Sequence, residues 1–217
     1  MIKIENIETF AWESAVRGAR NPMNSWEKSD SYWITSAKGS SPEYCLGEND
    51  YKLLCRLANS GPDHGKFMRQ IIVTMDITAP LYWWKEFDTY KVGTVANSCS
   101  TMHKIQANQF TLDDFSHEHL TSNFGETYEA MDALCDVIGV LNRNRDLYNQ
   151  TKDKKYWWNM IQILPSSYNQ KRTVTLNYQV LRNIYHARLY HKLDEWRTLC
   201  AEIKKLPYSE LITGENV

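Results

Sequence analysis

The sequence has no excess of positive charge. Its 217 residues include 25 basic and 26 acidic side chains, which gives a formal net charge of −1. A protein whose main partner is a nucleic-acid polymer needs a basic face that contacts phosphates. The charge balance therefore argues against a nucleic-acid polymer as partner, and it leaves room only for a local basic pocket.

Long apolar runs are also absent. No stretch approaches the roughly 20 apolar residues that a membrane-spanning helix needs. The opening MIKIENIETF lacks the charged and then apolar pattern of a signal peptide. We therefore expect a cytoplasmic protein with no membrane partner.

The pattern of cysteine and histidine predicts no metal site. The five cysteines are widely spaced and form no C-x-x-C pair, so neither a zinc site nor a disulfide framework is indicated, and reduced thiols are expected. His117 and His119 flank Glu118 in a polar segment, where solvated side chains are a simpler interpretation than a metal site.

Aromatic residues are abundant, with 8 tryptophans and 13 tyrosines. Rings at this density suit planar ligands or a subunit interface, although core packing accounts for most of them. A chain of this length forms one large domain or two small ones. We expect a single domain over residues 1–217, with a loose tail at 208–217.

The stretch from Gly61 to Ile105 organises the rest of the chain. FMRQIIVTMDI predicts a partly buried strand that stops at Ala79-Pro80, and LYWWKEF predicts a helix that starts at Pro80. KVGTVANSCSTMHK is a loop rich in hydroxyl groups. We interpret the strand, the aromatic helix and the loop as scaffold, wall and floor of a pocket for a flat polar ligand.

Other segments predict further helices and strands. Apolar periodicity predicts a helix with Asn49 as its N-cap, and a helix that starts at an Asn123/Glu126 capping box and runs to about Gln150. A following helical segment ends at Pro165. Strands are expected at IKIENI, SYWITSA and TVTL, a short helix at ETFAWESAVRGAR, and a last long helix that breaks near Leu193-Asp194.

That last helix places an arginine on an apolar face. With Asn177 as N-cap, the spacing puts Leu181, Ile184, Arg188 and His191 on one side of the helix. A guanidinium cannot lose its proton, so on a core-facing side it must meet an anion. The anion is either a carboxylate of the same chain or a phosphate or acidic ring of a ligand, unless the side chain extends outward to solvent.

Three segments together resemble a known family. They are GPDHGKF followed by ITAP, TYKVGTVANSCS, and ILPSSYNQKRTVTLNYQVLRNIYHARLYHKLDEW. In order and spacing they resemble motifs of the flavin-dependent thymidylate synthases. The resemblance implies an α/β fold, with a mixed sheet flanked by helices. It also implies a homotetramer, because the active sites of the family form between subunits.

The resemblance implies an activity. The family converts dUMP to dTMP, with methylenetetrahydrofolate as carbon donor, FAD as cofactor and NADPH as reductant. The partner implied here is dUMP or a related pyrimidine deoxynucleotide. In the family chemistry reduced flavin supplies the hydride and no cysteine nucleophile is used, so the absence of a cysteine motif, Cys99 included, does not count against it.

Site residues follow from the resemblance by position. The flavin-facing residues would be His64, Lys91, Asn177, Asn183 and His191, and the nucleotide-facing residues would be Glu86, Asn97, Ser100 and Arg188, with Arg188 and Lys91 taking part in catalysis. Simpler roles remain open. His64 would cap a turn, Lys91 would be solvated, and Ser100 and Asn177 would be N-caps.

The sequence lacks the family's R-H-R signature. An alignment anchored on Ala79-Pro80 puts Thr89-Tyr90-Lys91 at that position, and a second alignment puts Trp84-Lys85-Glu86 there. Ile161 and Gln179 stand where further arginines are typical. FAD carries a pyrophosphate and dUMP a phosphate, so Lys91, His103, Lys104, Arg69 or backbone N–H groups would have to replace the lost charges.

Three hypotheses remain. The first is a divergent flavin-dependent thymidylate synthase. The second is a family member without synthase activity that serves as a nucleotide-binding or assembly protein, which the missing R-H-R favours. The third is a flavoenzyme that performs another one-carbon transfer on a pyrimidine nucleotide.

Overall fold

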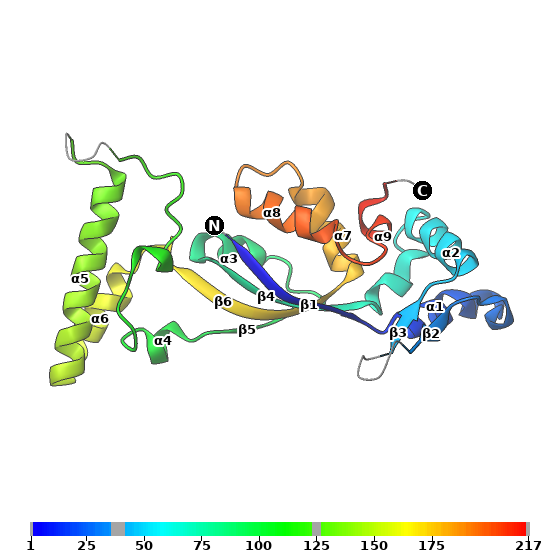
Figure 1. Ribbon diagram of the computed structural model, residues 1–217, viewed down its shortest axis with the longest axis horizontal. Coiled ribbons are helices and arrows are strands. Elements are labelled where there is room, and N and C mark those ends of the chain that lie inside the picture. Colours follow the sequence, from blue (N-terminus) through cyan, green and yellow to red (C-terminus); the bar gives the residue numbers. More distant parts are fainter. Residues whose placement is uncertain (1, 36–41, 123–126, 216–217) are drawn as a thin grey trace. The chain divides into compact units, whose positions relative to one another are not determined.

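The computed structural model of the chain describes residues 2–35, 42–122 and 127–215 (Figure 1). Its strands are β1 (Lys3–Phe10), β2 (Tyr32–Ile34), β3 (Glu43–Cys45), β4 (Ile72–Pro80), β5 (Val95–Ser98) and β6 (Asn169–Asn177). Its α-helices are α1 (Trp12–Arg20), α2 (Glu48–Asn59), α3 (Leu81–Phe87), α4 (Thr101–Lys104), α5 (Ala130–Thr151), α6 (Lys154–Ile163), α7 (Tyr178–Arg188), α8 (Asp194–Ile203) and α9 (Glu210–Thr213). The 3₁₀ helices are η1 (Asn21–Met23), η2 (Trp26–Lys28), η3 (Gly65–Arg69) and η4 (Leu112–Asp114).

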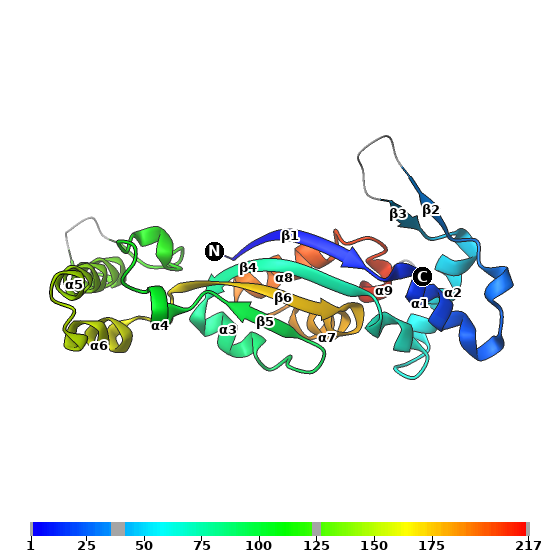
Figure 2. The same cartoon turned by 90° about the horizontal axis from the view of Figure 1, so that it is seen from below.

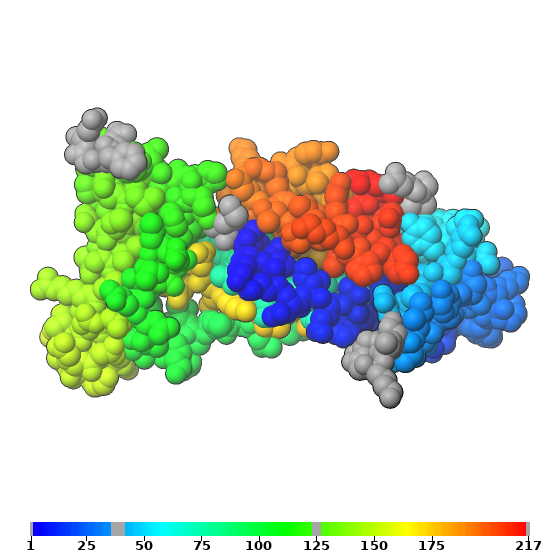
Figure 3. All heavy atoms as spheres, viewed as in Figure 1, coloured from blue at the N-terminus to red at the C-terminus, as the bar shows by residue number. Residues whose placement is uncertain are grey.

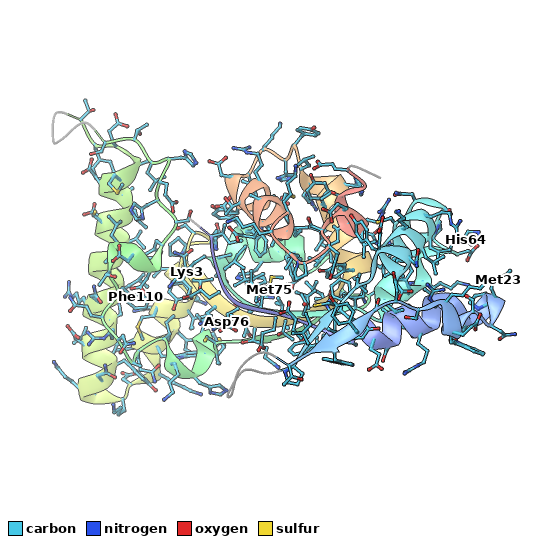
Figure 4. The ribbon with its side chains drawn as sticks, turned by 45° about the vertical axis from the view of Figure 1, so that its right-hand side comes forward. Lys3, Met23, His64, Met75, Asp76 and Phe110 are labelled. Carbon is cyan, nitrogen blue, oxygen red and sulfur yellow. The ribbon has the colours of Figure 1, made fainter. Side chains whose placement is uncertain are left out.

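Four strands form one sheet in the order β1-β4-β6-β5, and neighbouring strands run in opposite directions (Figure 2). The central strand β4 alternates buried and partly exposed residues, with Val73, Met75, Ile77 and Ala79 buried. This period of two is the pattern of a strand with one face in a core. On the other face Asp76 accepts hydrogen bonds from Asn6 (2.9 Å) and Thr173 (2.6 Å), next to Met75 in Figure 4. The predicted α/β class, a sheet flanked by helices, is confirmed, but the sheet is antiparallel where a mixed sheet was expected.

The chain divides into two compact units. Unit 1 comprises Met1–Lys3, Ile77–Thr89 and Asn97–Arg172, and unit 2 comprises Ile4–Asp76, Tyr90–Ala96 and Thr173–Val217. Each strand of the four-stranded sheet contributes residues to both units. The single domain therefore stays a prediction.

Unit 1 has a core built on the α5 and α6 pair. Its buried members are Ile105, Phe110, Phe115, Leu134, Leu141 and Met160. Helix α5 begins after Glu129, which forms a capping box with Asp132. The predicted box at Asn123 and Glu126 lies outside the described residues. Both helices end close to the predicted points, and α6 stops two residues before Pro165.

The tryptophans of α3 are fully buried. Trp83 and Trp84 are 0% exposed and Phe87 is 2% exposed. The prediction that this helix forms a pocket wall is therefore wrong for these rings, because the helix turns its aromatic side inward. Pro80 precedes the helix as its N-cap, one position before the predicted place in the first turn.

Unit 2 packs α7 against α8, α9 and η3, and the orange to red residues of α7–α9 form a continuous surface (Figure 3). Leu211 and Ile212 of α9 are 0% exposed, so the prediction of a loose tail is wrong up to residue 215. The Tyr178 hydroxyl of α7 donates to the Pro207 carbonyl at 2.5 Å, which holds the segment before α9 against α7.

Two elements at the start of unit 2 differ from expectation. The segment after SYWITSA, for which no strand was predicted, contains β3, which pairs antiparallel with β2. Helix α2 begins at Glu48, and Asn49 is inside it. The role of N-cap falls to the carboxylate of Asp30, which accepts from the amides of Asn49 (2.8 Å) and Asp50 (3.0 Å). Within the described residues, no helix combines the length and the apolar character that crossing a membrane requires.

Candidate functional site

Helix α7 organises the candidate site in unit 2. It starts where predicted, with Asn177 in an extended conformation and its side-chain oxygen accepting from the Val180 amide at 3.0 Å. Leu181 and Ile184 are 0% exposed and fix the inward face. The predicted N-cap role of Asn177 is confirmed, and an N-cap of this type stabilises a helix by about 1 kcal/mol.

The loop at residues 90–94 lies against the start of α7. Gly93 has φ +78°, and a Cβ placed on it would lie 3.1 Å from Asn177 Nδ2 and 3.2 Å from Val180 Cγ2. Only glycine tolerates both the left-handed backbone and the close approach. Lys91 is two residues earlier, in a turn closed by the Thr94 amide on its carbonyl (3.3 Å). Gly93 therefore brings the turn that carries the exposed Lys91 to the N-terminal end of α7.

The same loop reaches the other end of α7 through Tyr90. The Tyr90 hydroxyl accepts from Arg188 Nε at 3.0 Å. The guanidinium carbon of Arg188 lies 4.6 Å from the centre of the Trp196 ring and 5.7 Å from that of Tyr90. A planar cation stacked on two rings loses side-chain freedom before any ligand arrives. Arg188 is thus held half-buried among aromatic rings.

His191 is not on the helical face that the spacing predicts. Helix α7 ends at Arg188, and the His191 amide donates to the Arg188 carbonyl at 3.0 Å in the turn that follows. Its Nδ1 accepts from the Leu193 amide (3.2 Å), and its ring lies 6.2 Å from Trp196. The prediction of a shared helical face is wrong because the helix stops. The turn nevertheless brings His191 to the tryptophan that also stacks on Arg188.

His64 lies in the segment that packs on the start of α7. It is the exposed N-cap residue of η3, and with Met23 it lines a cavity of about 610 Å³. Figure 4 labels both residues. A Cβ on the next residue, Gly65, would lie 3.7 Å from Gln179 Oε1. This Oε1 is buried and has no hydrogen-bond partner among the described residues. The amide nitrogen of Gln179 donates to Asn183 Oδ1 at 3.1 Å, so an unsatisfied acceptor lies beside two of the predicted residues.

The remaining predicted residues belong to unit 1. Glu86 is half-buried in the last turn of α3, and Thr89 Oγ1 donates to its carbonyl at 2.8 Å. Asn97 is exposed on β5. Ser100 is the N-cap of α4 and accepts from the His103 amide at 3.2 Å. The simpler reading of Ser100 as an N-cap is therefore confirmed.

Ser100 also lines a cavity of about 300 Å³ with two lysines, Lys104 and Lys171. Lys171 was missed because NQKR resembles a turn, whereas these residues belong to β6. The Cys99 amide donates to the Lys171 carbonyl (2.9 Å), and Gln170 Nε2 donates to the Cys99 carbonyl (3.0 Å). Two positive side chains therefore flank the hydroxyl-rich segment.

Neighbouring contacts fix this wall of the cavity. Arg172 stacks at 4.2 Å from the centre of the Trp84 ring and donates to Asp88 at 2.8 Å, and the Trp84 indole donates to the Gln170 carbonyl at 2.9 Å. Burial, followed by the charges of Asp114 and Cys99, raises the pKa of Tyr168. Tyr168 is therefore a neutral phenol in the wall at physiological pH.

Comparisons with known proteins rest on structure. No protein-family model matches the sequence, and no curated protein matches it. The flavin-dependent thymidylate synthase ThyX of Helicobacter pylori, solved with FAD and dUMP, matches with a TM-score of 0.67 at 16% identity, over 97% of this chain and 99% of that one. Another structure of that enzyme, also with FAD and dUMP, gives a TM-score of 0.68 at 16% identity, over 99% and 98%. The UMP/dUMP methylase PolB of Streptomyces cacaoi, solved with 5-Br dUMP, gives 0.59 at 17% identity, over 99% and 95%.

The chain has the fold of the flavin-dependent thymidylate synthases. The resemblance found in the sequence is thus confirmed at the level of fold, along almost the whole chain. Within this flavin-dependent thymidylate synthase fold, the preferred alignment places Thr89-Tyr90-Lys91 at R-H-R. Two of these residues, Tyr90 and Lys91, belong to the loop at 90–94 that contacts α7. The loop is present although its arginines are not.

Proposed function

We propose that this protein is a divergent flavin-dependent thymidylate synthase. It would methylate dUMP to dTMP, with methylenetetrahydrofolate as carbon donor, reduced FAD as hydride source and NADPH as the reductant of the flavin. The observation that carries the proposal is the loop at 90–94. It contacts both ends of α7 and brings Lys91 toward Asn177 and Tyr90 to Arg188, in a chain with the fold of enzymes solved with FAD and dUMP.

The residues around α7 fit a flavin. The first amides of a helix and a nearby lysine suit a pyrophosphate, because both favour negative charge. Lys91 and the start of α7 provide that pair. The buried Oε1 of Gln179, which lacks a donor among the described residues, suits an N–H group of the flavin ring. Asn183 and His64 lie on the elements beside it, and His191 borders Trp196.

The residues that we assign to the nucleotide are Arg188 of unit 2 and Glu86, Asn97 and Ser100 of unit 1. Arg188, fixed on Trp196, would hydrogen-bond a pyrimidine oxygen and stabilise negative charge that develops on it when a nucleophile or hydride adds to the ring at C6. Lys104 and Lys171, which share a cavity with Ser100, would supply positive charge toward the phosphate. They would replace the guanidinium groups that the sequence lacks.

The bound flavin would supply the hydride, and no cysteine nucleophile is assigned. The state of the buried thiols agrees with this assignment. Burial raises the pKa of Cys200 to about 11 and also raises the pKa of Cys55. Both are therefore protonated at neutral pH and are poor nucleophiles.

The direct test is anaerobic turnover. Purified protein is incubated with FAD, NADPH, methylenetetrahydrofolate and dUMP, and the products are separated by mass. Formation of dTMP that requires all four additions supports the proposal. A methylated or hydroxymethylated pyrimidine nucleotide other than dTMP would indicate a different one-carbon transfer, and no product at all would exclude the synthase.

A second candidate is a nucleotide-binding or assembly protein without synthase activity. Thr89 and Tyr90 at the aligned R-H-R positions favour it, because neither carries a charge. It predicts that dUMP raises the melting temperature of the protein while no product forms. A ligand that binds only the folded protein raises the free energy of unfolding by RT ln(1 + [L]/Kd). This is about 2.7 kcal/mol at a ligand concentration one hundred times Kd, which a thermal scan detects. A cytoplasmic location and a homotetramer remain part of both proposals.

A further inference from the structure

A second cavity in unit 2 is separate from the residues assigned above. It lies between α1 and the β2–β3 hairpin, and we name it the hairpin cleft. Its volume is about 280 Å³, and the lining residues used below are Glu13, Arg17, Trp26, Tyr32, Trp33 and Tyr44. None of the residues assigned to flavin or nucleotide lines it.

The cleft presents large rings to solvent. Trp26, Tyr32 and Trp33 are 49%, 56% and 53% exposed. Trp33 faces Tyr44 across the hairpin, with ring centres 5.1 Å apart in an edge arrangement. The Trp26 indole donates to Asn21 Oδ1 at 2.8 Å, so its ring has a fixed direction. Exposed rings of this size bind flat ligands by stacking, because stacking removes their faces from water.

The floor of the cleft is rigid. Asp50 is 0% exposed and accepts from Arg20 Nε (2.5 Å), from the hydroxyls of Ser29 and Ser31 (2.6 Å each), and from the amides of Asp30 (3.2 Å) and Ser31 (3.1 Å). These bonds tie the segment that carries Trp26 and Tyr32 to α2. A ligand would therefore meet walls already in place, which limits the entropy lost on binding.

The charges at the hairpin cleft favour the binding of an anion at Arg17. Arg20 is neutralised by Asp50. Arg17, by contrast, is exposed, and its side chain donates only to Ser14 Oγ at 3.5 Å; among the described residues it forms no ion pair. A guanidinium in this setting forms a bidentate contact with a phosphate. Glu13 adds an acceptor that suits a sugar hydroxyl.

We propose that the hairpin cleft binds a free nucleoside monophosphate. The base stacks on Trp26 and Trp33, the phosphate contacts Arg17, and a ribose hydroxyl donates to Glu13. The cavity volume of about 280 Å³ lies just below the usual range for ligand pockets, about 300–1,000 Å³, which favours a ligand no larger than one nucleotide. The terminal nucleotide of a single strand offers the same chemistry, but the net charge of −1 disfavours a polymer.

Fluorine NMR of the full chain labelled with 5-fluorotryptophan tests the proposal at the site itself. Trp26→Phe and Trp33→Phe variants assign the two resonances. Trp158 of α6, 48% exposed, is the matched reference. Titration with AMP should shift the Trp26 and Trp33 resonances along one saturation curve and leave Trp158 in place. Because these reporters lie in the hairpin cleft, the result is independent of the proposed synthase activity.

Two charge variants sharpen the test. Arg17→Gln should raise the dissociation constant for AMP about tenfold, the usual effect of losing a charged hydrogen bond. Arg143→Gln makes the same change on an exposed arginine of α5 and should leave the constant unchanged. Three outcomes would overturn the proposal. In the first, the Trp26 and Trp33 resonances stay fixed up to about 10 mM AMP, a concentration that nearly saturates a site with a dissociation constant of about 1 mM. In the second, adenosine binds as tightly as AMP, and in the third, a six-residue oligoadenylate saturates the site at a lower concentration than AMP.

Discussion

Two arginines of unit 2, Arg20 and Arg188, lie in different surroundings. Arg20 is 5% exposed and bound to the Asp50 carboxylate, so its charge is neutralised by a carboxylate of the same chain. Arg188 is half-buried, stacks on Trp196 and donates to the Tyr90 hydroxyl. The two rings fix the direction of the Arg188 guanidinium. At the scale of single residues, Arg188 is therefore the one to test for binding and Arg20 the one to test for stability.

Replacing Arg188 by Ala should weaken dUMP binding by about 10- to 100-fold, because a hydrogen bond to a charged group contributes about 1.5–3 kcal/mol. Isothermal titration measures the loss. Arg188→Lys keeps the charge but not the stacking and the fork, and should recover only part of the affinity. Arg143→Ala, on α5, is the control. Wild-type affinity in Arg188→Ala would remove this residue from the site.

Replacing Asp50 by Ala should destabilise the protein by about 3–5 kcal/mol, because Arg20 then remains as a buried charge without its partner. Urea denaturation measures the change. Glu48→Ala in the exposed pair with Lys52 should change stability by less than about 1 kcal/mol. Equal effects of the two substitutions would contradict the role assigned to Asp50.

The Asp50 pair also makes stability depend on pH. Burial raises the pKa of Asp50, but the hydrogen bonds from Ser29, Ser31 and Arg20 outweigh burial, and the net pKa is lowered. A lowered folded-state pKa gives a contribution that is present above the unfolded value, about 3.9, and is lost as pH falls through the folded value. The stability difference between wild type and Asp50→Ala should therefore shrink below about pH 4. A difference that stays constant down to pH 2 would contradict this.

At the scale of elements, the account depends on the contact between the loop at 90–94 and α7. Gly93→Ala should strain the left-handed backbone and push the loop away from Asn177 and Val180, at a cost of about 1–3 kcal/mol. It should also weaken FAD binding, because the loop carries Lys91.

Gly139→Ala is the matched control for Gly93→Ala. Gly139 lies within α5, and a Cβ there meets nothing within 4 Å. The substitution should stabilise the protein by about 0.5–1 kcal/mol and leave FAD binding unchanged. Equal FAD affinity in both variants would show that the loop does not hold the flavin.

The sequence predicted the elements whose limits are local. Pro80 and Pro165 mark the ends of β4 and α6, and Asn177 caps α7, because proline and cap residues act on their own neighbours. It missed β3, whose three residues are defined by pairing with β2. It also missed α9, whose burial depends on packing against α7 and α2. Contacts between distant segments leave no local pattern.

The candidate site was predictable to a similar extent. Helical spacing drew attention to Arg188, whereas Asn183 and the ligand role of Asn177 came from the family resemblance, and all three roles stay predictions. Lys171 was missed, since its place beside Ser100 depends on β6 continuing into the NQKR segment. The contact of Tyr90 with Arg188 joins positions 98 residues apart. It could not be read from spacing at all.

At the scale of the whole molecule, the fold persists at 16–17% identity. Buried positions alternate along β4 and line one face of α7, and the packing there restricts which residue types fit. Charged residues on the surface are less constrained by packing. This explains how the fold remains while the R-H-R arginines do not. The fold alone does not specify the chemistry, which depends on the residues around α7.

The proposed assembly is tested by light scattering on a size-exclusion column. Apolar residues are exposed on α5 and α6, among them Val140 (42%) and Ile163 (40%). Such residues are typical of faces that associate. A homotetramer should elute with about four times the chain mass of 25.4 kDa. A mass of one chain at micromolar concentration would contradict it.

FAD uptake tests the central claim most directly. Purified protein is dialysed against FAD, and the bound flavin is measured by its visible absorbance after free flavin is removed. We predict close to one FAD per chain, with a changed spectrum and with further thermal stabilisation on addition of dUMP. Colourless protein that retains no flavin and whose melting temperature does not respond to dUMP would contradict the account.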